Sequence, residues 1–368
     1  IRDLIVTGVQ TCALPILVSK YQKTNTRIEQ ISLIFAIIAV AALFINMNNR
    51  NNNTENKTDN SLFDFACPLT EEANLVNLST TSLKTNRQLS LINFDTEIYE
   101  TGLTKNEIPV ITNPDITNLA SLKTCLGDDD ELLIVTIDGL SRAYPKRILR
   151  FHIAVNDTIG NIPILITYSP LSNYYQVFSR LIDNEVYQFG ISGLLYKNTD
   201  MLFDTLTETL WSPLNGKALV GNMIGAKLTT LPHTVTSLKN ILNSQPTIQS
   251  ISFKTGFIRD YNQDPFLTYA AEDKQVVGKI TYYTDDLNYK TQVIGFNIDE
   301  QPYAFPTIEE IGLITKNFEI NNEVFTVTFD EKQVINIEDS SGNIIDSQSM
   351  YWFVWFDLQP KTKLINLN

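Results

Sequence analysis

The strongest constraint on the fold of this chain is an internal duplication. The segment from Leu133 to Pro170, shifted by 305 − 144 = 161 positions, lies without a gap on the segment from Ile294 to Glu331. Nine of the 38 aligned positions are identical, and others are similar, as where Tyr144 meets Phe305. Each copy is also expected to end with a helix, then Gln-Pro, then a short strand. Such repeats imply two supersecondary units stacked to close one core.

The pattern from about residue 130 onward is mostly that of β-strands. Stretches such as "ELLIVTI", "NIPILITY" and "EVYQFGI" are short, rich in β-branched and aromatic residues, and bounded by Gly, Asn, Asp or Pro. Helices look few, the clearest being at Thr234 to Ser244 and near Ser347 to Leu358. We therefore expect a mainly β fold with a few short helices, in which two unequal repeats form a pseudo-twofold barrel or sandwich.

The duplication also divides the chain. Repeat 1 spans residues 131–254 and repeat 2 spans residues 291–368, and the insert at residues 255–290 has no counterpart in repeat 2. Residues 61–130 are expected to form an N-terminal extension that packs on the main domain. A length of 368 residues is enough for about two domains, so a sizeable core is available.

The beginning of the chain has a different character. The first 16 residues, "IRDLIVTGVQTCALPI", resemble a translated sequencing-adapter remnant and are left out of the fold argument. Residues 31–47 carry no charge, and about 17 helical residues reach the lower limit for crossing a bilayer. Basic residues precede them in residues 17–30, which we expect in the cytoplasm, with the bulk of the chain outside. The sequence therefore predicts a single-pass signal-anchor in the cell membrane.

Two alternatives to the anchor stay open. Small residues near the end of the apolar run also suit a cleaved signal peptide. A buried helix of a soluble domain is the weaker alternative, because the run has no polar face. The Asn-rich residues 48–60 that follow are expected to be a disordered linker, since they have too few apolar side chains to bury.

Composition excludes several classes of function. A formal net charge of −13 and the lack of a basic stripe argue against nucleic acid or an anionic lipid surface as a partner. Only three Cys and two His are present, too few for most zinc sites, so we expect no metal and no cofactor. A His-dependent mechanism would have to use His152 or His233. Pairing of Cys67 with Cys125 in a disulfide is possible outside the cytoplasm.

The duplication serves as an internal control for function. A residue needed only for the fold should persist in both copies, as Pro145 and Asn156 do, and we interpret both as turn and packing residues. Several polar residues of repeat 1 do not persist in repeat 2. We therefore expect a polar cleft formed by repeat 1 and the insert, lined by Arg142, His152, Asp157, Tyr168, Arg259 and Asp260.

Three blocks of the sequence resemble a known family. They are "IDGLSRAYPKRILRFHIAVNDTIGNIPILITYSPLS", "FGISGLLYKNTDMLFDTLTETLWSPLNGKALVG" and "TGFIRDYNQDPF". Together they are similar to the bacterial domain-of-unknown-function family 3179 over roughly residues 108–367. The resemblance implies a duplicated C-terminal half and a site near the Arg-Ala-Tyr-Pro turn and the His before Val-Asn-Asp, but it brings no established activity.

The chain departs from that family at one segment. Where the family usually has Tyr-Cys-Pro-Leu-Cys, this chain has Ser169 and Ser172 in place of the two cysteines. A serine hydroxyl is neither a thiolate nor a useful ligand for a transition metal, so thiol redox chemistry and a Cys-ligated metal are excluded at this place. The simplest interpretation is that the serines make local hydrogen bonds at a strand end.

A Ser–His hydrolase is the sharper alternative. Ser169 or Ser172 would attack and His152 would take the proton, with Asp157 or Asp138 orienting the imidazole and Arg142 nearby. The chain has no Gly-x-Ser-x-Gly motif, and a hydrogen-bonded, half-buried imidazole is the structural alternative for His152.

Aromatic residues offer candidate ligand contacts. Tyr168, Tyr174, Tyr175 and Trp211 could stack on a sugar or a peptide, with Arg259 and Asp260 beside them. The aromatic run at residues 350–356 is better explained as core, and the acidic run at residues 127–132 as a solvated turn. Paired carboxylates for glycoside chemistry stay open, because sequence does not show their separation.

These observations favour a membrane-tethered, extracytoplasmic binding or surface-interaction module. Its ligand would be a small molecule, a sugar or a peptide. A metal-independent hydrolase that uses Ser169 or Ser172 with His152 is the alternative, and a purely structural role is the third possibility.

Overall fold

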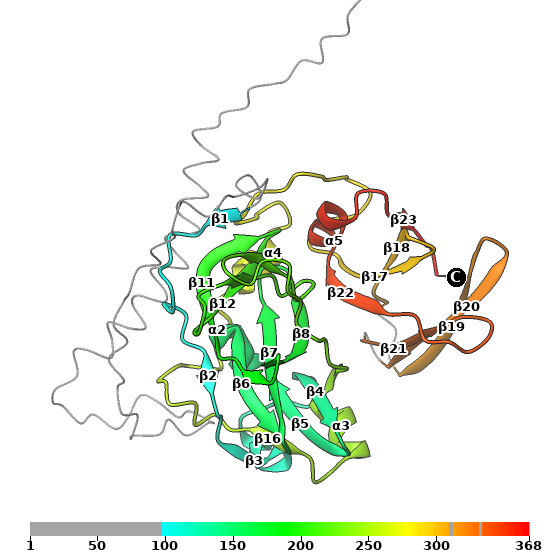
Figure 1. Ribbon diagram of the computed structural model, residues 1–368. Helices are drawn as coiled ribbons and strands as arrows, with labels where there is room; N and C mark the ends of the chain where they lie inside the picture. Colours follow the sequence, from blue (N-terminus) through cyan, green and yellow to red (C-terminus); the bar gives the residue numbers. More distant parts are fainter. Residues whose placement is uncertain (1–97, 309–311, 331–332, 368) are drawn as a thin grey trace, which may run out of the picture.

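The fold is mainly β, with a few short helices. A computed structural model describes residues 98–308, 312–330 and 333–367. Five sheets of three to five strands and one two-stranded ribbon make up the described part, and Figure 1 shows these sheets following one another around a ring, in the manner of a propeller. They neither merge into one closed barrel nor pair as a simple sandwich, so only the coarser part of the predicted architecture is confirmed.

The first hairpin of each repeat lies in a core sheet. Core sheet 1 has the strand order β15 (Thr234–Ser237), β4 (Glu131–Ile137), β5 (Leu140–Pro145), β16 (Gln249–Ile251), β3 (Ile116–Asn118). Core sheet 2 has the order β22 (Ser347–Tyr351), β17 (Gln292–Ile298), β18 (Gln301–Pro306), β23 (Lys363–Leu364). Strands β4 and β17 begin and end 292 − 131 = 161 positions apart, as do β5 and β18. The cross-strand pair Leu133 with Tyr144 thus matches Ile294 with Phe305.

The second hairpin of each repeat lies in a flank sheet. Flank sheet 1 has the order β2 (Ile111–Thr112), β6 (Ala154–Ile159), β7 (Ile162–Ser169), β8 (Tyr174–Ser179). Flank sheet 2 has the order β19 (Leu313–Ile320), β20 (Glu323–Asp330), β21 (Gln333–Glu338). Strands β7 and β20 are also 161 positions apart at both ends. The alignment made on the sequence is therefore also an alignment of strands.

A strand and a helix end each repeat. The segments predicted as helices are each a strand followed by a seven-residue helix: β15 then α3 (Leu238–Ser244), and β22 then α5 (Trp352–Leu358). Ser237 pairs with Glu131, and Tyr351 pairs with Gln292, the residue equivalent to Glu131. Ser237 and Tyr351 are therefore equivalent residues, and this last part of the two repeats aligns with a shift of 351 − 237 = 114. The same shift carries β16 onto β23, and each of them pairs in parallel with the second strand of its core-sheet hairpin.

Contacts between the repeats follow the same equivalence. Strand β22 of repeat 2 lies beside β8 of repeat 1, and β15 of repeat 1 lies beside β21 of repeat 2. The aromatic run at residues 350–356 packs in the core, as predicted, because Met350, Trp352, Phe353, Val354 and Trp355 are buried together.

One sheet has no counterpart among the described residues of repeat 2. The cover sheet has the order β1 (Ile98–Glu100), β11 (Phe189–Tyr196), β12 (Thr199–Asp204), β13 (Leu210–Trp211), β14 (Ala218–Val220). It packs on one face of flank sheet 1, where Ala154 and Leu165 share a cluster with Phe189, Leu202 and Trp211. All strands of the cover sheet except β1 follow the ribbon of β9 (Leu181–Ile182) and β10 (Glu185–Val186) in the chain.

Local signals explain several turns. Asp183 and Asn184, between β9 and β10, both have positive φ, as expected for a tight hairpin. The helices η1 (Leu119–Thr124), α2 (Lys146–His152) and α4 (Leu267–Ala271) were not predicted from the sequence. Asn156 was expected in a turn, but it lies in the middle of β6 with its side chain bonded to the main chain of Phe189.

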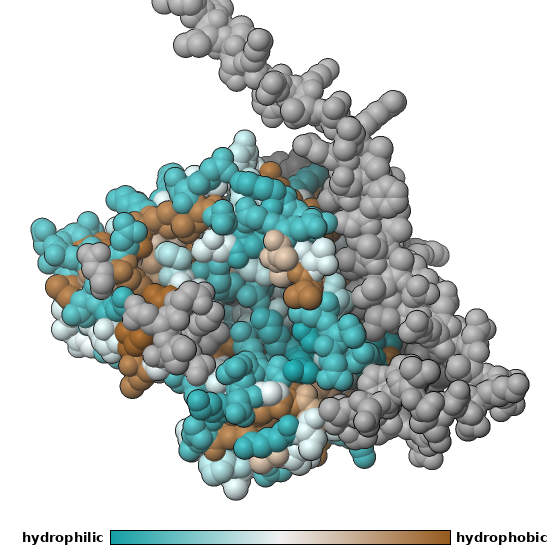
Figure 2. Space-filling view, turned by 180° about the vertical axis from the view of Figure 1, so that it is seen from behind, coloured by the Kyte–Doolittle hydropathy of each residue, from teal (hydrophilic) through white to brown (hydrophobic). Residues whose placement is uncertain are grey.

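The predictions for residues 1–97 lie outside the described residues. They include the adapter remnant, the cytoplasmic segment, the signal-anchor at residues 31–47 and the linker. None of the described helices has the length and apolar character needed to cross a membrane. Cys125 is disulfide-bonded to a partner outside the described residues, so its pairing with Cys67 stays a prediction. Seen from behind, the surface is mostly hydrophilic, with separate apolar patches on the side of repeat 2 (Figure 2).

Candidate functional site

Asp157, on β6, is at the centre of a buried ion pair in repeat 1. Its Oδ2 atom accepts hydrogen bonds from Nη1 of Arg142 and from the hydroxyl of Tyr144, both at 2.7 Å. Burial, followed by the charge of Asp157, raises the pKa of Tyr144 well above its usual range. The structure thus brings Arg142 and Asp157 together, as expected, but their side chains are only 12% and 6% exposed. They form part of the interior and do not line an open cleft.

The equivalent place in repeat 2 is aromatic. A shift of 161 carries Arg142, Tyr144 and Asp157 to Tyr303, Phe305 and Phe318, which are buried in one cluster. The ring centroids of Phe305 and Phe318 lie 5.9 Å apart. A buried ion pair is often replaceable by apolar side chains of similar volume. The two repeats therefore show two packing solutions for one core position.

His152, the last residue of α2, is fully buried and has both ring nitrogens occupied. Its Nδ1 lies 2.7 Å from the carbonyl oxygen of Pro109, and its Nε2 lies 2.7 Å from the hydroxyl of Tyr261. A carbonyl oxygen only accepts, so Nδ1 carries the proton and Nε2 accepts from Tyr261. Burial, with a smaller effect of the charge of Arg259, lowers the pKa of His152 to about 3. The structure therefore does not form the predicted Ser–His pair.

Both serines of the "YSPLS" segment also point inward. Ser169, at the end of β7, donates to Oδ2 of Asp200 on β12 at 2.6 Å, and both residues are buried. The hydroxyl of Ser172 lies 3.5 Å from the carbonyl oxygen of Ser169. Burial raises the pKa of Asp200 to about 6, although the hydrogen bond from Ser169 opposes the rise. Neither hydroxyl is presented to a substrate.

The expected stacking residues pack on one another. The rings of Tyr168 and Tyr175 are stacked with centroids 4.4 Å apart, and both residues are buried. Lys146 lies 5.4 Å from the centroid of the Tyr168 ring and forms an ion pair of 3.1 Å with Glu131, which also accepts from the hydroxyl of Tyr175. This cluster joins α2, β4, β7 and β8, and its rings leave no face for a ligand.

The other candidate ligand contacts are dispersed. Trp211 is fully buried and donates from Nε1 to Asp204 at 2.9 Å. Tyr174 is buried and accepts from the side chain of Gln176. The remaining two lie in the insert: the side chain of Arg259 is buried and donates to a main-chain carbonyl, and Asp260 accepts from a main-chain amide two residues on. The predicted ligand-binding set is therefore not one surface.

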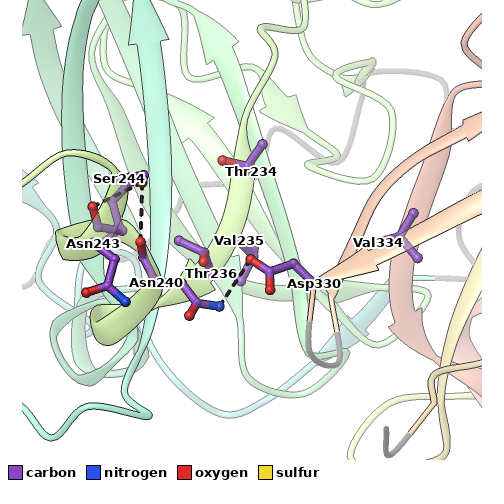
Figure 3. A pocket seen from close by; sticks show the side chains of 9 residues that line it. Thr234, Val235, Thr236, Asn240, Asn243, Ser244, Asp330 and Val334 are labelled. Carbon is purple, nitrogen blue, oxygen red and sulfur yellow. Dashed lines mark hydrogen bonds between the residues drawn. The ribbon is translucent and has the colours of Figure 1, made fainter. Parts of the chain in front are cut away.

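A groove opens instead where the two repeats meet. It has a volume of about 460 Å³ and lies between α3 and β15 of repeat 1 and the ends of β20 and β21 in repeat 2. Figure 3 shows Asn240 and Asp330 facing each other across it, with Nδ2 of Asn240 donating to Oδ2 of Asp330 at 3.1 Å. The lining combines hydroxyl, amide and apolar side chains with one carboxylate: Thr234, Val235, Thr236, Asn240, Ile241, Asn243, Ser244, Asp330 and Val334.

The duplication relates this groove to the serine segment. The shift of 161 carries Ser169 to Asp330, and the shift of 114 carries Asn240 and Ile241 to Val354 and Trp355. At the junction of β22 and β8, Val354 and Trp355 pack in one buried cluster with Leu171 and Tyr174. One junction between the repeats is thus filled by apolar side chains, and its equivalent is open and polar.

Sequence reasoning missed the groove residues. Asn240 and Asp330 are 90 positions apart, and no local motif links them. The alignment did hold a signal, because Asp330 is the counterpart of Ser169 and polar Asn240 replaces an apolar position of the other helix. Among the described residues, no group of three or more His, Cys, Asp or Glu side chains is placed to hold a metal ion.

Comparison with known proteins agrees with the extent of the fold. The family model described as "Protein of unknown function (DUF3179)" matches residues 105–362. Searches of curated proteins and of solved structures each find no match. The matched range begins before core sheet 1 and ends just before β23, so it includes repeat 1, the insert, most of repeat 2 and all of the cover sheet except β1.

Proposed function

We propose that this chain, which belongs to the DUF3179 family, is a binding module that takes up a neutral polar ligand in the groove between its repeats. The observation that carries the proposal is the contrast between two sets of polar residues. The hydrogen-bonding groups of the residues in repeat 1 are bonded to other protein groups in the interior. Those of the groove line an open space of about 460 Å³, within the usual range of small-molecule sites.

The lining of the groove favours a sugar. Two threonines, one serine and two asparagines supply donors and acceptors, and Asp330 supplies a carboxylate that can accept two hydroxyls. Among the described residues, the side chains that line the groove include no cation, so an anionic ligand would meet no counter-charge there. Val235, Ile241 and Val334 add apolar contacts of the kind that the non-polar face of a pyranose needs. A neutral peptide is the competing occupant.

The hydrolase alternative has less support. Ser169 has a carboxylate partner in Asp200, but both are buried and a substrate would have to displace the cover sheet to reach them. His152 is neutral with its Nε2 lone pair occupied, so it has no site for a serine proton. A general base must lie within hydrogen-bond reach of the proton that it takes. A binding role needs none of these contacts.

A membrane tether outside the cytoplasm is part of the proposal. Its support is the uncharged stretch at residues 31–47 with basic residues before it. A tether would hold a weak binding site at a surface and so raise the effective concentration of ligand around it. Two serines in place of a cysteine pair fit the same function, since a binding module needs no thiol chemistry.

We also infer that the ring is pseudo-twofold and descends from one doubled β unit. The equal spacing of strands β4, β5 and β7 with β17, β18 and β20 supports this inference. The two equivalent junctions, β22 with β8 and β15 with β21, support it independently. The cover sheet and the insert are then later additions to the first unit.

The proposal is tested by ligand titration on the purified full chain. Neutral disaccharides of glucose, galactose and N-acetylglucosamine, and neutral tripeptides, are titrated while amide NMR signals are recorded. We expect shifts at residues 234–244 and 328–334 with a sugar, and loss of these shifts in Asn243→Trp, which fills the groove. Lys239→Trp, an exposed position of the same helix outside the groove lining, should bind normally.

Three results would contradict the proposal. Equal binding by Asn243→Trp and wild type would place the ligand elsewhere. Shifts with tripeptides alone would make the groove a peptide site. Covalent labelling of Ser169 or Ser172 by a fluorophosphonate, with turnover of an ester substrate, would favour the hydrolase.

A further inference from the structure

The repeats differ in how one face of their flank sheets is covered. In repeat 1, residues 180–233 separate β8 from β15 and contain most of the cover sheet, whereas in repeat 2 only residues 339–346 separate β21 from β22. The cover sheet packs on the face of flank sheet 1 that carries Ala154 and Leu165. The same face of flank sheet 2, called the bare face below, has no covering sheet among the described residues (Figure 1).

The residues of the bare face have changed accordingly. Ala154 and Leu165, which are fully buried, correspond to Thr315 and Thr326, which are exposed and half-buried. Asn156 bonds twice to the main chain of Phe189 in the cover sheet, whereas its counterpart Asn317 accepts from the hydroxyl of Thr326 at 3.0 Å. The two apolar contacts are thus replaced by threonines and the asparagine bonds within its own sheet, as expected for a face that is open to water.

The bare face still has features of an interaction surface. Leu313 and Val324, which the strand register places on it, are 72% and 49% exposed. They lie at opposite ends of the hairpin, because Leu313 is opposite Asp330 and Val324 is opposite Glu319, so each offers a separate apolar contact to a segment laid along the sheet and the two do not form a continuous patch.

Next to the bare face, flank sheet 2 also has an open strand edge, that of β19. Strand β6 of flank sheet 1 has the short parallel strand β2 on its outer side, with Ile111 opposite Val155. The equivalent outer edge of the eight-residue strand β19 has no strand paired to it within the described ranges. Open edges of this length pair readily with an added strand. The contact of β2 with β6 shows the direction in which such a strand would run.

The charge of the bare face indicates which kind of polypeptide strand would bind at the edge of β19. The register places three carboxylates there, those of Glu319, Asp330 and Glu338, and no Lys or Arg of the described residues. The whole chain has a formal net charge of −13, so two copies of this acidic face would repel each other. A chain that bears positive side chains on alternate residues would complement it, because alternate side chains of an added strand point to the same face.

We propose that flank sheet 2 is a docking site for an extended basic polypeptide segment, which adds to the edge of β19 and lays its lysine or arginine side chains over the bare face. The backbone bonds to β19 supply affinity. The carboxylates of Glu319 and Glu338 supply the preference for positive charge and a dependence on salt. The site is separate from the sugar groove except at Asp330, so the two proposals can fail independently.

The test uses the full chain and two synthetic probes. A fluorescent twelve-residue peptide of alternating Lys and Val is compared with its Glu-Val match by anisotropy at 50, 150 and 300 mM salt. We expect binding of the Lys-Val peptide alone, weakened about tenfold or more between the lowest and highest salt. Hydrogen exchange of the wild-type complex should show new protection at the amides of β19.

Charge-reversal variants separate the site from the overall charge. Glu319→Lys with Glu338→Lys should weaken binding at least tenfold, whereas Glu185→Lys with Glu300→Lys, two exposed carboxylates on other hairpins, should leave it within twofold. Equal weakening in both double variants, or protection outside residues 313–338, would overturn the proposal. So would a concentration-dependent dimer without peptide that protects β19, because a second copy would then be the occupant.

Discussion

The ion pair of Arg142 and Asp157 offers the sharpest test of the relation between the repeats. In repeat 1 Asp157 accepts from Arg142 and Tyr144 at 2.7 Å in the interior. In repeat 2 the equivalent side chains, Tyr303, Phe305 and Phe318, are packed without an ion pair. We predict that Arg142→Tyr with Tyr144→Phe and Asp157→Phe, which copies repeat 2 into repeat 1, leaves the protein folded.

The single substitutions should be much more damaging than the transplant. Arg142→Tyr removes the guanidinium that donates to the buried Asp157 carboxylate, and breaking a buried pair in this way costs about 3–5 kcal/mol of unfolding free energy. Asp157→Phe likewise leaves the largely buried Arg142 guanidinium without the carboxylate to which it donates. The triple variant removes both charges, so its loss should be within about 2 kcal/mol of wild type. The hydrogen bond from Arg180 to the main-chain carbonyl of residue 157 is kept.

Urea unfolding measures these differences. The three tryptophans of the chain, at positions 211, 352 and 355, are buried, so their fluorescence reports unfolding. A variant of the exposed pair of Lys274 and Asp285, such as Asp285→Ala, should not change the unfolding free energy measurably and serves as the control. If the triple variant loses as much as the sum of the single variants, the two places are not equivalent packing solutions and the reasoning is refuted.

Two further predictions concern packing and pH. A Cβ on Gly295 would lie 2.3 Å from the ring of Trp355, so Gly295→Ile should lower the unfolding free energy by about 3 kcal/mol or more. Gly295→Ile combined with Trp355→Ile copies the equivalent residues Ile134 and Ile241, and it should regain most of this loss in urea unfolding. If the double variant regains nothing, the two positions are not equivalent. Asp200 has a folded pKa of about 6 against an ordinary 3.8, so the folded state holds its proton more tightly and stability is lost as pH rises from 4 to 6. Asp200→Asn should therefore gain up to about 3 kcal/mol at pH 7 and nothing at pH 3.5, and an equal gain at both values would refute the assignment.

The strands were predictable from the sequence because their pattern is local and occurs twice. The equal spacing of β4 with β17 and of β7 with β20 follows from an alignment without gaps. Helix α2 was missed because it is short and lies between two strands of β-like composition. The cover sheet was not recognised as a separate sheet, since no repeat of its pattern elsewhere in the chain marked it.

The candidate site was less predictable because hydrogen-bond partners are distant in sequence. His152 bonds to Pro109 and Tyr261, which are 43 and 109 positions away, and nothing near His152 in the sequence indicates that both its nitrogens are occupied. Ser169 likewise finds Asp200 only through the packing of the cover sheet. Residue type and lack of persistence between the repeats selected these polar positions, but only the fold shows which groups they bond to in the interior.

The polar residues of repeat 1 are buried and bonded to other protein groups, which makes them part of the internal structure. NMR titration of the two histidines tests it directly, because only His152 and His233 give imidazole signals. With a folded pKa of about 3 for His152, its signals should stay those of neutral imidazole down to pH 4, and stability should fall as pH drops from 6.5 toward 3, where the unfolded state alone takes a proton. A His152 signal that titrates near pH 6.5 would show an accessible imidazole and contradict the account.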